Sequence, residues 1–124
     1  MSAFHNPDAH PYSPAFAADG FAFVSGALSV DAEGTAVAGR TEALDAALER
    51  MSERLATVGG RLEDVVKLTY FVTDVSLREE ANDQFRRVFD HPRPARTFLE
   101  VSDLPYGSTV EIDCIARLRE DSVD

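Results

Sequence analysis

The sequence predicts an α+β protein with the element order β-β-α-β-α-β-β, in which two helices cover one face of a β-sheet. Two observations support this prediction. In two segments, apolar residues recur at intervals of three and four, as they do along one face of a helix. In others, β-branched and aromatic residues form short runs bounded by glycine or proline, which is typical of strands.

The start of the chain predicts an extended arm followed by a β-hairpin. Residues 1–14 contain three prolines and few large apolar side chains, which favours an arm over a helix. Residues 16–30 are rich in Phe, Val and Leu and are interrupted by Gly20 and Gly26. They predict a hairpin that continues through a turn at residues 31–34.

Two amphipathic helices are predicted. The first spans residues 40–58 and ends at the glycine pair 59–60. The second begins at Ser76, whose spacing to Glu79 fits a capping box, and ends before the prolines that follow. The apolar stripes are Leu44, Ala47, Leu48, Met51, Leu55 and Val58 in the first helix, and Leu77, Ala81, Phe85, Val88 and Phe89 in the second.

Three further strands are predicted at residues 65–72, 96–101 and 109–118. The first of these places Val66, Leu68, Tyr70 and Val72 on one side. In the last, Val110, Ile112, Cys114, Ala116 and Leu118 alternate with Glu111, Asp113, Ile115, Arg117 and Arg119. The first set suits a helix-covered core, whereas the second faces water or lines a contact between subunits. An uncovered, partly aromatic sheet face favours a symmetric oligomer.

Composition limits the class of protein. A chain of 124 residues is most simply one domain, residues 1–124. Its formal net charge of −10 opposes binding to nucleic acid and to anionic membranes. The single cysteine excludes an internal disulfide, and neither a signal peptide nor an apolar run of about 20 residues is present, so we expect a cytoplasmic protein.

Familiar catalytic and metal-binding motifs are absent from the sequence. It contains no G-x-S-x-G elbow, phosphate loop, dinucleotide fingerprint or Cys/His pair at zinc spacing, so we expect no metal and no cofactor. His5 and His10 fall in the arm, and His91 is expected to complement the dipole at the end of the second helix. Cys114 is expected to be a small buried hydrophobe.

In the segment 91–97, Arg96 is expected at the start of a strand, after a loop that two prolines stiffen. A guanidinium held still in this way can grip a carboxylate with two parallel hydrogen bonds. Two interpretations stay open: Arg96 pairs with one of the chain's many acids, or it binds a ligand. Glu111, expected on the neighbouring strand, is either its partner or a group that holds a water or exchanges a proton with substrate.

Several motifs resemble those of one family. They are Pro94-Ala95-Arg96-Thr97, Glu100-Val101, Leu104-Pro105 and the run Val110 to Ala116, supported by His10-Pro11-Tyr12-Ser13, Val24-Ser25-Gly26, the strand 67–74 and Asn82 before Phe85 and Phe89. From end to end the chain resembles the Rid family, the reactive intermediate deaminases, also called YjgF or endoribonuclease L-PSP.

This resemblance implies a chorismate-mutase-like α+β fold with a mixed sheet, assembled as a homotrimer with a small cleft at each subunit interface. It also implies cofactor-independent hydrolysis of enamines and imines, such as 2-aminoacrylate, to 2-oxo acids and ammonia. By position, Arg96 would clamp the substrate carboxylate and Glu111 would help hold the attacking water. The pocket would be shaped by Tyr12, Ser25, Gly26, Asn82 and Phe98.

Three departures and two alternatives accompany the resemblance. The loop 103–107 is aromatic where the family has a charged version, which implies a larger or more aromatic substrate. Phe98 replaces a cysteine that often acts through its backbone carbonyl, and His10 replaces a glycine. A non-catalytic trimer that binds small carboxylic acids would need Arg96 but not Glu111. An endoribonuclease is disfavoured by the charge of −10 and by the lack of a histidine pair for phosphodiester chemistry.

Overall fold

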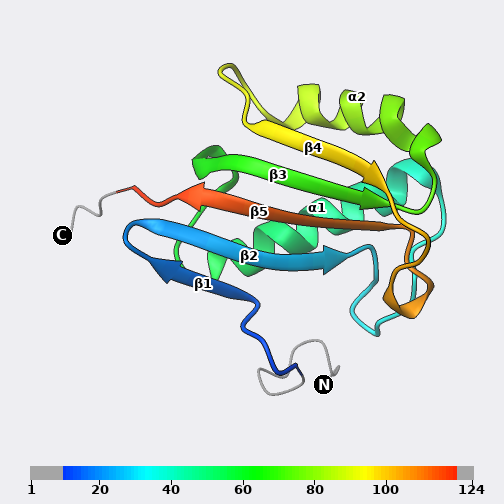
Figure 1. Ribbon diagram of the computed structural model, residues 1–124, viewed down its shortest axis with the longest axis horizontal. Coiled ribbons are helices and arrows are strands. Elements are labelled where there is room, and N and C mark those ends of the chain that lie inside the picture. The colour runs from blue at the N-terminus through cyan, green and yellow to red at the C-terminus, as the bar shows by residue number, and fades with distance from the viewer. Residues whose placement is uncertain (1–9, 120–124) are drawn as a thin grey trace.

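The predicted order of elements is confirmed by a computed structural model, which describes residues 10–119 (Figure 1). Most of the predicted arm, including His5, lies outside the described residues. The elements are β1 (Ala15–Ala18), β2 (Phe21–Leu28), α1 (Arg40–Ala56), β3 (Val65–Val72), α2 (Arg78–Val88), β4 (Ala95–Glu100) and β5 (Val110–Arg117).

The five strands form one mixed sheet in the order β1-β2-β5-β3-β4. Neighbouring strands are antiparallel except β3 and β4, which run parallel because α2 carries the chain back along the sheet between them. Figure 1 shows α1 behind the sheet and α2 beside β4. The prediction of an α+β fold with two helices on one face is therefore confirmed.

The predicted hairpin is made of β1 and β2. Asp19 and Gly20 join the two strands with φ angles of 54° and 84°, the left-handed conformation of the tight turns that match strand twist. Residues 31–34 form a second turn, closed by a bridge between Val30 and Ala36. The pairing of β2 with β5 shifts at Ser25 and Gly26, so β2 is irregular at this point.

One hydrophobic core lies between the sheet and the helices. The predicted alternation in β5 is confirmed, since Val110, Ile112, Cys114 and Ala116 are buried on the helix side. A polar chain crosses this core: the Tyr70 hydroxyl donates to Oε1 of Gln84 at 2.8 Å, and Nε2 of Gln84 donates to Asp45 at 2.9 Å. These bonds join β3 to both helices.

The inward set of β3 was predicted wrongly at its first position. Val65 is buried and Val66 is 42% exposed, because the pairing with β5 shifts between Val65 and Lys67. The bulge restores the predicted alternation from Leu68 onward.

The predicted ends of the second helix were also wrong. Asp74, not Ser76, caps the turn that precedes α2, and its carboxylate accepts from the Ser76 N–H at 2.9 Å. The helix ends at Val88, so His91 lies beyond it and does not complement its dipole. His91 instead lies 2.8 Å from Nη1 of Arg93.

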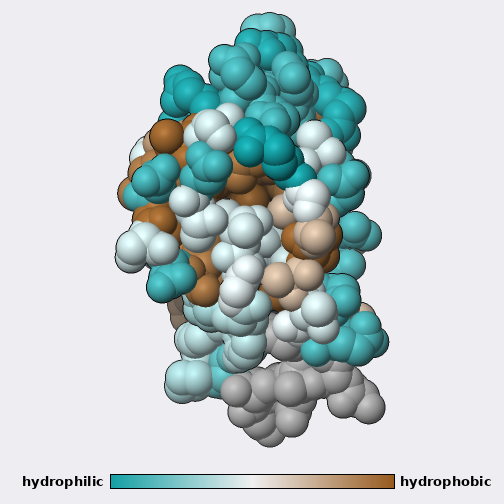
Figure 2. Space-filling view, turned by 90° about the vertical axis from the view of Figure 1, so that its right-hand side faces the viewer, coloured by the Kyte–Doolittle hydropathy of each residue, from teal (hydrophilic) through white to brown (hydrophobic). Residues whose placement is uncertain are grey.

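The face of the sheet away from the helices is partly apolar. Phe16, Phe21, Phe23 and Leu99 are 37–62% exposed, and three of them come from β1 and β2. Viewed from the right-hand side of Figure 1, hydrophilic side chains gather over α2, whereas hydrophobic surface appears below it (Figure 2). No helix within residues 10–119 is long and apolar enough to cross a membrane.

Candidate functional site

Arg96 lies on the helix side of β4, inside a cage of aromatic rings. Its guanidinium carbon is 5.0 Å from the ring centre of Phe85, 5.2 Å from that of Tyr70 and 5.3 Å from that of Phe98. Nη2 donates to Oδ1 of Asn82 in α2 at 2.6 Å. Contact with ring faces stabilises a cation while keeping water away from it. We call Arg96, Asn82 and Phe98 the arginine cluster.

The guanidinium of Arg96 keeps an unused donor. None of the ion pairs found within residues 10–119 includes Arg96, so the first of its two interpretations, pairing with an acid of the same chain, is not found there. Its Nη1 is buried and has no hydrogen-bond partner in that range. Burial lowers the pKa of Arg96, although a guanidinium stays charged at neutral pH. An unsatisfied buried donor costs stability, and an anionic ligand would remove that cost.

Glu111 lies on the opposite face of the sheet. It pairs with Leu28 of β2 and Phe71 of β3, while its neighbours Val110 and Ile112 point into the core. Burial raises the pKa of Glu111, and the nearby charge of Asp113 adds to this, whereas Arg54 opposes it. A carboxyl with a raised pKa takes up and releases protons closer to neutral pH.

Gly26 makes room for the carboxylate of Glu111. A Cβ atom at this position would overlap Oε2 of Glu111, so no other residue fits without a shift. Ser25, beside it, binds the N-terminal segment: its N–H donates to Pro14 O at 3.0 Å and its hydroxyl to Ser13 O at 2.7 Å. These bonds hold the segment containing Tyr12 along β2. We call Tyr12, Ser25, Gly26 and Glu111 the glutamate cluster.

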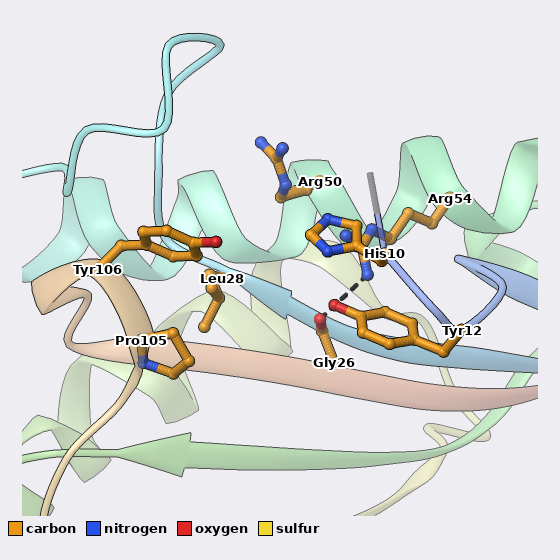
Figure 3. A pocket seen from close by; sticks show the side chains of 8 residues that line it. All are labelled: His10, Tyr12, Gly26, Leu28, Arg50, Arg54, Pro105 and Tyr106. Atoms are coloured by element: carbon orange, nitrogen blue, oxygen red, sulfur yellow. Dashed lines mark hydrogen bonds between the residues drawn. The ribbon is translucent and has the colours of Figure 1, made fainter. Parts of the chain in front are cut away.

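A cavity of about 140 Å³ opens beside Gly26 (Figure 3). Arg54 of α1 borders it and donates from Nη1 to Gly26 O at 3.1 Å. The rings of His10 and Tyr12 stack with centres 5.0 Å apart. The cavity is lined by His10, Tyr12, Gly26, Leu28, Arg50, Arg54, Pro105 and Tyr106. Sequence reasoning missed the two arginines, although two cations four residues apart on a helix of so acidic a chain were a usable signal.

The two clusters are separated within one chain. Because β3 lies between β4 and β5, Glu111 is not on the strand next to Arg96, and that expectation was wrong. Arg96 pairs with Leu68 and Glu111 with Phe71, so their backbones lie two strands, about 10 Å, apart across the sheet and about 10 Å apart along it. The side chains also point to opposite faces. The structure therefore brings together the residues within each cluster, but it does not bring the two clusters together in one chain.

Cys114 behaves as the sequence predicts. It is buried on the core face of β5, and burial raises the pKa of its thiol to about 12. A thiol with this pKa is protonated at neutral pH and is a poor nucleophile.

The fold defines the class of protein. The structure superposes on RidA from the Antarctic bacterium Psychrobacter sp. PAMC 21119 with a TM-score of 0.82 and 28% identity, covering 95% of this chain and 97% of that chain. It also superposes on E. coli TdcF with bound serine, with a TM-score of 0.79 and 27% identity, covering 90% of each chain.

The sequence places the chain in that family. The family described as Endoribonuclease L-PSP matches residues 4–118, so this protein belongs to that family. It is the same Rid family that the sequence motifs resemble. A 2-iminobutanoate/2-iminopropanoate deaminase of Capra hircus is 36% identical over 108 residues, which cover 86% of this chain and 79% of that relative.

Proposed function

We propose that this protein is a cofactor-independent deaminase that hydrolyses 2-imino acids, and the enamines in equilibrium with them, to 2-oxo acids and ammonia. The observation that supports this best is the caged guanidinium of Arg96, which keeps a buried donor without a partner. The deaminase named among the relatives acts on substrates of this kind, as its name states.

The proposed reaction needs few groups, because an imine carbon is already electrophilic. Arg96 holds the substrate carboxylate and fixes the position of the C=N bond. As the water oxygen bonds to the imine carbon, Glu111 accepts a proton from the water, the π electrons of the C=N bond move to nitrogen, and nitrogen takes up that proton. The new hydroxyl then gives its proton to nitrogen while the C–N bond breaks, so ammonia leaves with the bonding electron pair and the 2-oxo group forms.

The active cleft is proposed to form between two copies of the chain in a homotrimer. The arginine cluster lies at the β4 edge of the sheet. The glutamate cluster lies where the start of β5 pairs with the end of β2, so one chain alone does not join the two clusters. Packing the β4 edge of one copy against the β2 side of the next would bring Arg96 to Glu111 of the partner subunit. It would also cover part of the exposed apolar face.

Replacement of Arg96 tests the clamp. The substrate is an imine generated in the assay by an amino-acid oxidase, and the measurement is the rate of ammonia release. Loss of a bidentate charged contact predicts that Arg96→Ala lowers kcat/KM by roughly two orders of magnitude. Arg86→Ala removes an exposed arginine from α2 and serves as the matched control. Equal activity of both variants would refute the role of Arg96.

Mixing two inactive variants tests the shared cleft. Arg96→Ala and Glu111→Gln are denatured together, refolded and assayed. If each cleft takes Arg96 from one copy and Glu111 from the next, about a quarter of the clefts in a random mixture are intact. Recovery of activity near that fraction is expected, and none is expected if both residues act within one chain.

A non-catalytic binder of small carboxylic acids is the second candidate, because TdcF was solved with bound serine. A binder needs Arg96 and not Glu111. Carboxylate binding that survives Glu111→Gln, with no ammonia release above the uncatalysed rate from any imine tested, would favour this function.

A further inference from the structure

We propose that the preferred substrate carries a second acidic group, which Arg54 and Arg50 bind in the cavity beside Gly26. The substrate class is then the imines of dicarboxylic amino acids. This inference rests on the proposed function and names the substrate of the same cleft.

The cavity is next to the glutamate cluster. The Glu111 carboxylate lies against Gly26, and Arg54 donates to the carbonyl oxygen of the same glycine at 3.1 Å. A substrate whose imine carbon is near Glu111 therefore has a cationic group within a few bonds of it. A cavity of about 140 Å³ has room for a carboxymethyl group, since a water molecule takes about 30 Å³ in the liquid.

The arrangement of charge favours an anion. Arg50 and Arg54 are four residues apart on α1, a spacing at which like charges repel and destabilise a helix. Burial, and after it the nearby charge of Arg54, lowers the pKa of Arg50, while Glu53 and Asp31 oppose that shift. Arg54 takes part in none of the ion pairs found within residues 10–119. A bound carboxylate would relieve the repulsion between the two guanidinium groups.

Aromatic rings form two walls of the cavity. In Figure 3, His10 and Tyr12 stand on one side of the cavity, and Pro105 and Tyr106 on the other. Tyr106 has a φ of 62°, a left-handed conformation that a non-glycine residue rarely adopts. A substrate seated between these walls would limit the access of water to the arginines, and this would strengthen an arginine–carboxylate pair.

Arg54 also has a structural role to be distinguished from binding. Its bonds to Gly26 O at 3.1 Å and Ser25 O at 3.5 Å support the irregular part of β2. An arginine that only supported the backbone would affect all substrates alike. One that also binds the second acid would affect the acidic substrate more.

The test compares two imines of equal length, generated by oxidases from glutamate and from glutamine. The two imines differ only at the end of the side chain, which is a carboxylate in the first and an amide in the second. We expect kcat/KM for the acidic imine to exceed that for the amide by tenfold or more. Arg54→Gln should lower this ratio at least tenfold, whereas Arg54→Lys, which keeps the charge, should retain most of it. Arg61→Gln removes an exposed arginine outside the cavity and should leave the ratio unchanged.

A binding measurement separates the two proposals. Calorimetry with 2-oxoglutarate and 2-oxobutanoate needs no turnover, and the dicarboxylate should bind at least tenfold more tightly in an Arg54-dependent way. Equal turnover of both imines, or equal losses on both in Arg54→Gln, overturns the second-acid inference and leaves the deaminase standing. Arg54-dependent preference for 2-oxoglutarate without turnover of any imine refutes the deaminase and supports the anion site.

Discussion

Glu111 shows how the surroundings of one side chain set its chemistry. The residue lies half-buried beside Gly26, with Asp113 on the same face of β5, and both burial and that neighbouring charge raise its pKa. The folded protein therefore holds a proton on Glu111 at pH values where the unfolded chain has released it. An ionised carboxylate at this position therefore reduces the stability of the fold.

The first prediction is that Glu111→Gln stabilises the protein at pH 7. Because the folded pKa lies above the ordinary value of 4.5, the destabilisation begins as pH rises through 4.5 and is complete above the folded pKa. Thermal denaturation should give a higher Tm for the variant at pH 7, and the difference should shrink towards pH 4. Glu49→Gln, an exposed carboxylate of α1, is the control. A lower Tm for Glu111→Gln at pH 7 would contradict the prediction.

Residue types that carry chemistry were only partly visible in the sequence. The two prolines before it pointed to Arg96. The resemblance identified Asn82, which does contact Arg96. Arg50 and Arg54 were missed because on a helical stripe an arginine resembles an ordinary solvated side chain. Only the packing of α1 against the sheet, where Arg54 reaches Gly26 O and Arg50 reaches Val30 O, places them at the cavity.

At the scale of elements, a buried hydroxyl joins β2 to β5. Ser29 is fully buried just beyond the end of β2, and its Oγ accepts from the N–H groups of Thr109 and Val110 at 3.3 Å and 3.2 Å. These bonds hold the start of β5, and hence the backbone just before Glu111.

The second prediction is that Ser29→Ala lowers the free energy of unfolding by roughly 1–3 kcal/mol, because buried N–H groups lose their acceptor. Denaturant titration monitored by circular dichroism measures the change. Ser102→Ala, at an exposed position in the loop before β5, should change it little. Equal effects of the two substitutions would show that the Ser29 bonds contribute nothing net.

The periodicities of the sequence determined where the elements lie but not how each begins and ends. The α1 stripe and the β5 alternation appear as predicted because burial of a face depends on spacing alone. The bulge at Val65 and the Asp74 cap were missed because they depend on pairing with β5 and on a competing side-chain acceptor.

At the scale of the molecule, the open face of the sheet exposes apolar side chains that a partner chain would bury. Phe23 is 46% exposed, and its β5 partner Ile115 is on the same face. The proposed homotrimer covers such a face and completes the cleft with the same contacts.

The third prediction therefore concerns assembly. Sedimentation should give a mass of about three times the 13.6 kDa chain. Phe23→Glu should shift the mass towards one chain and abolish deamination, because a charge on the apolar face opposes its burial. Val75→Glu, at an exposed apolar side chain in the turn before α2, adds the same charge outside the sheet as a control. A single-chain mass for the wild-type protein would overturn both the trimer and the shared cleft.

The sequence by itself determined the element order, the faces of most helices and strands, and the family. It also determined Arg96 and Glu111 as candidate residues, since short motifs and periodic patterns are local properties of the chain. Only the tertiary structure decided that β3 separates these two residues and that Arg54 reaches Gly26. The reason is physical: strand order and side-chain convergence arise from contacts between segments distant along the chain, which no local pattern specifies.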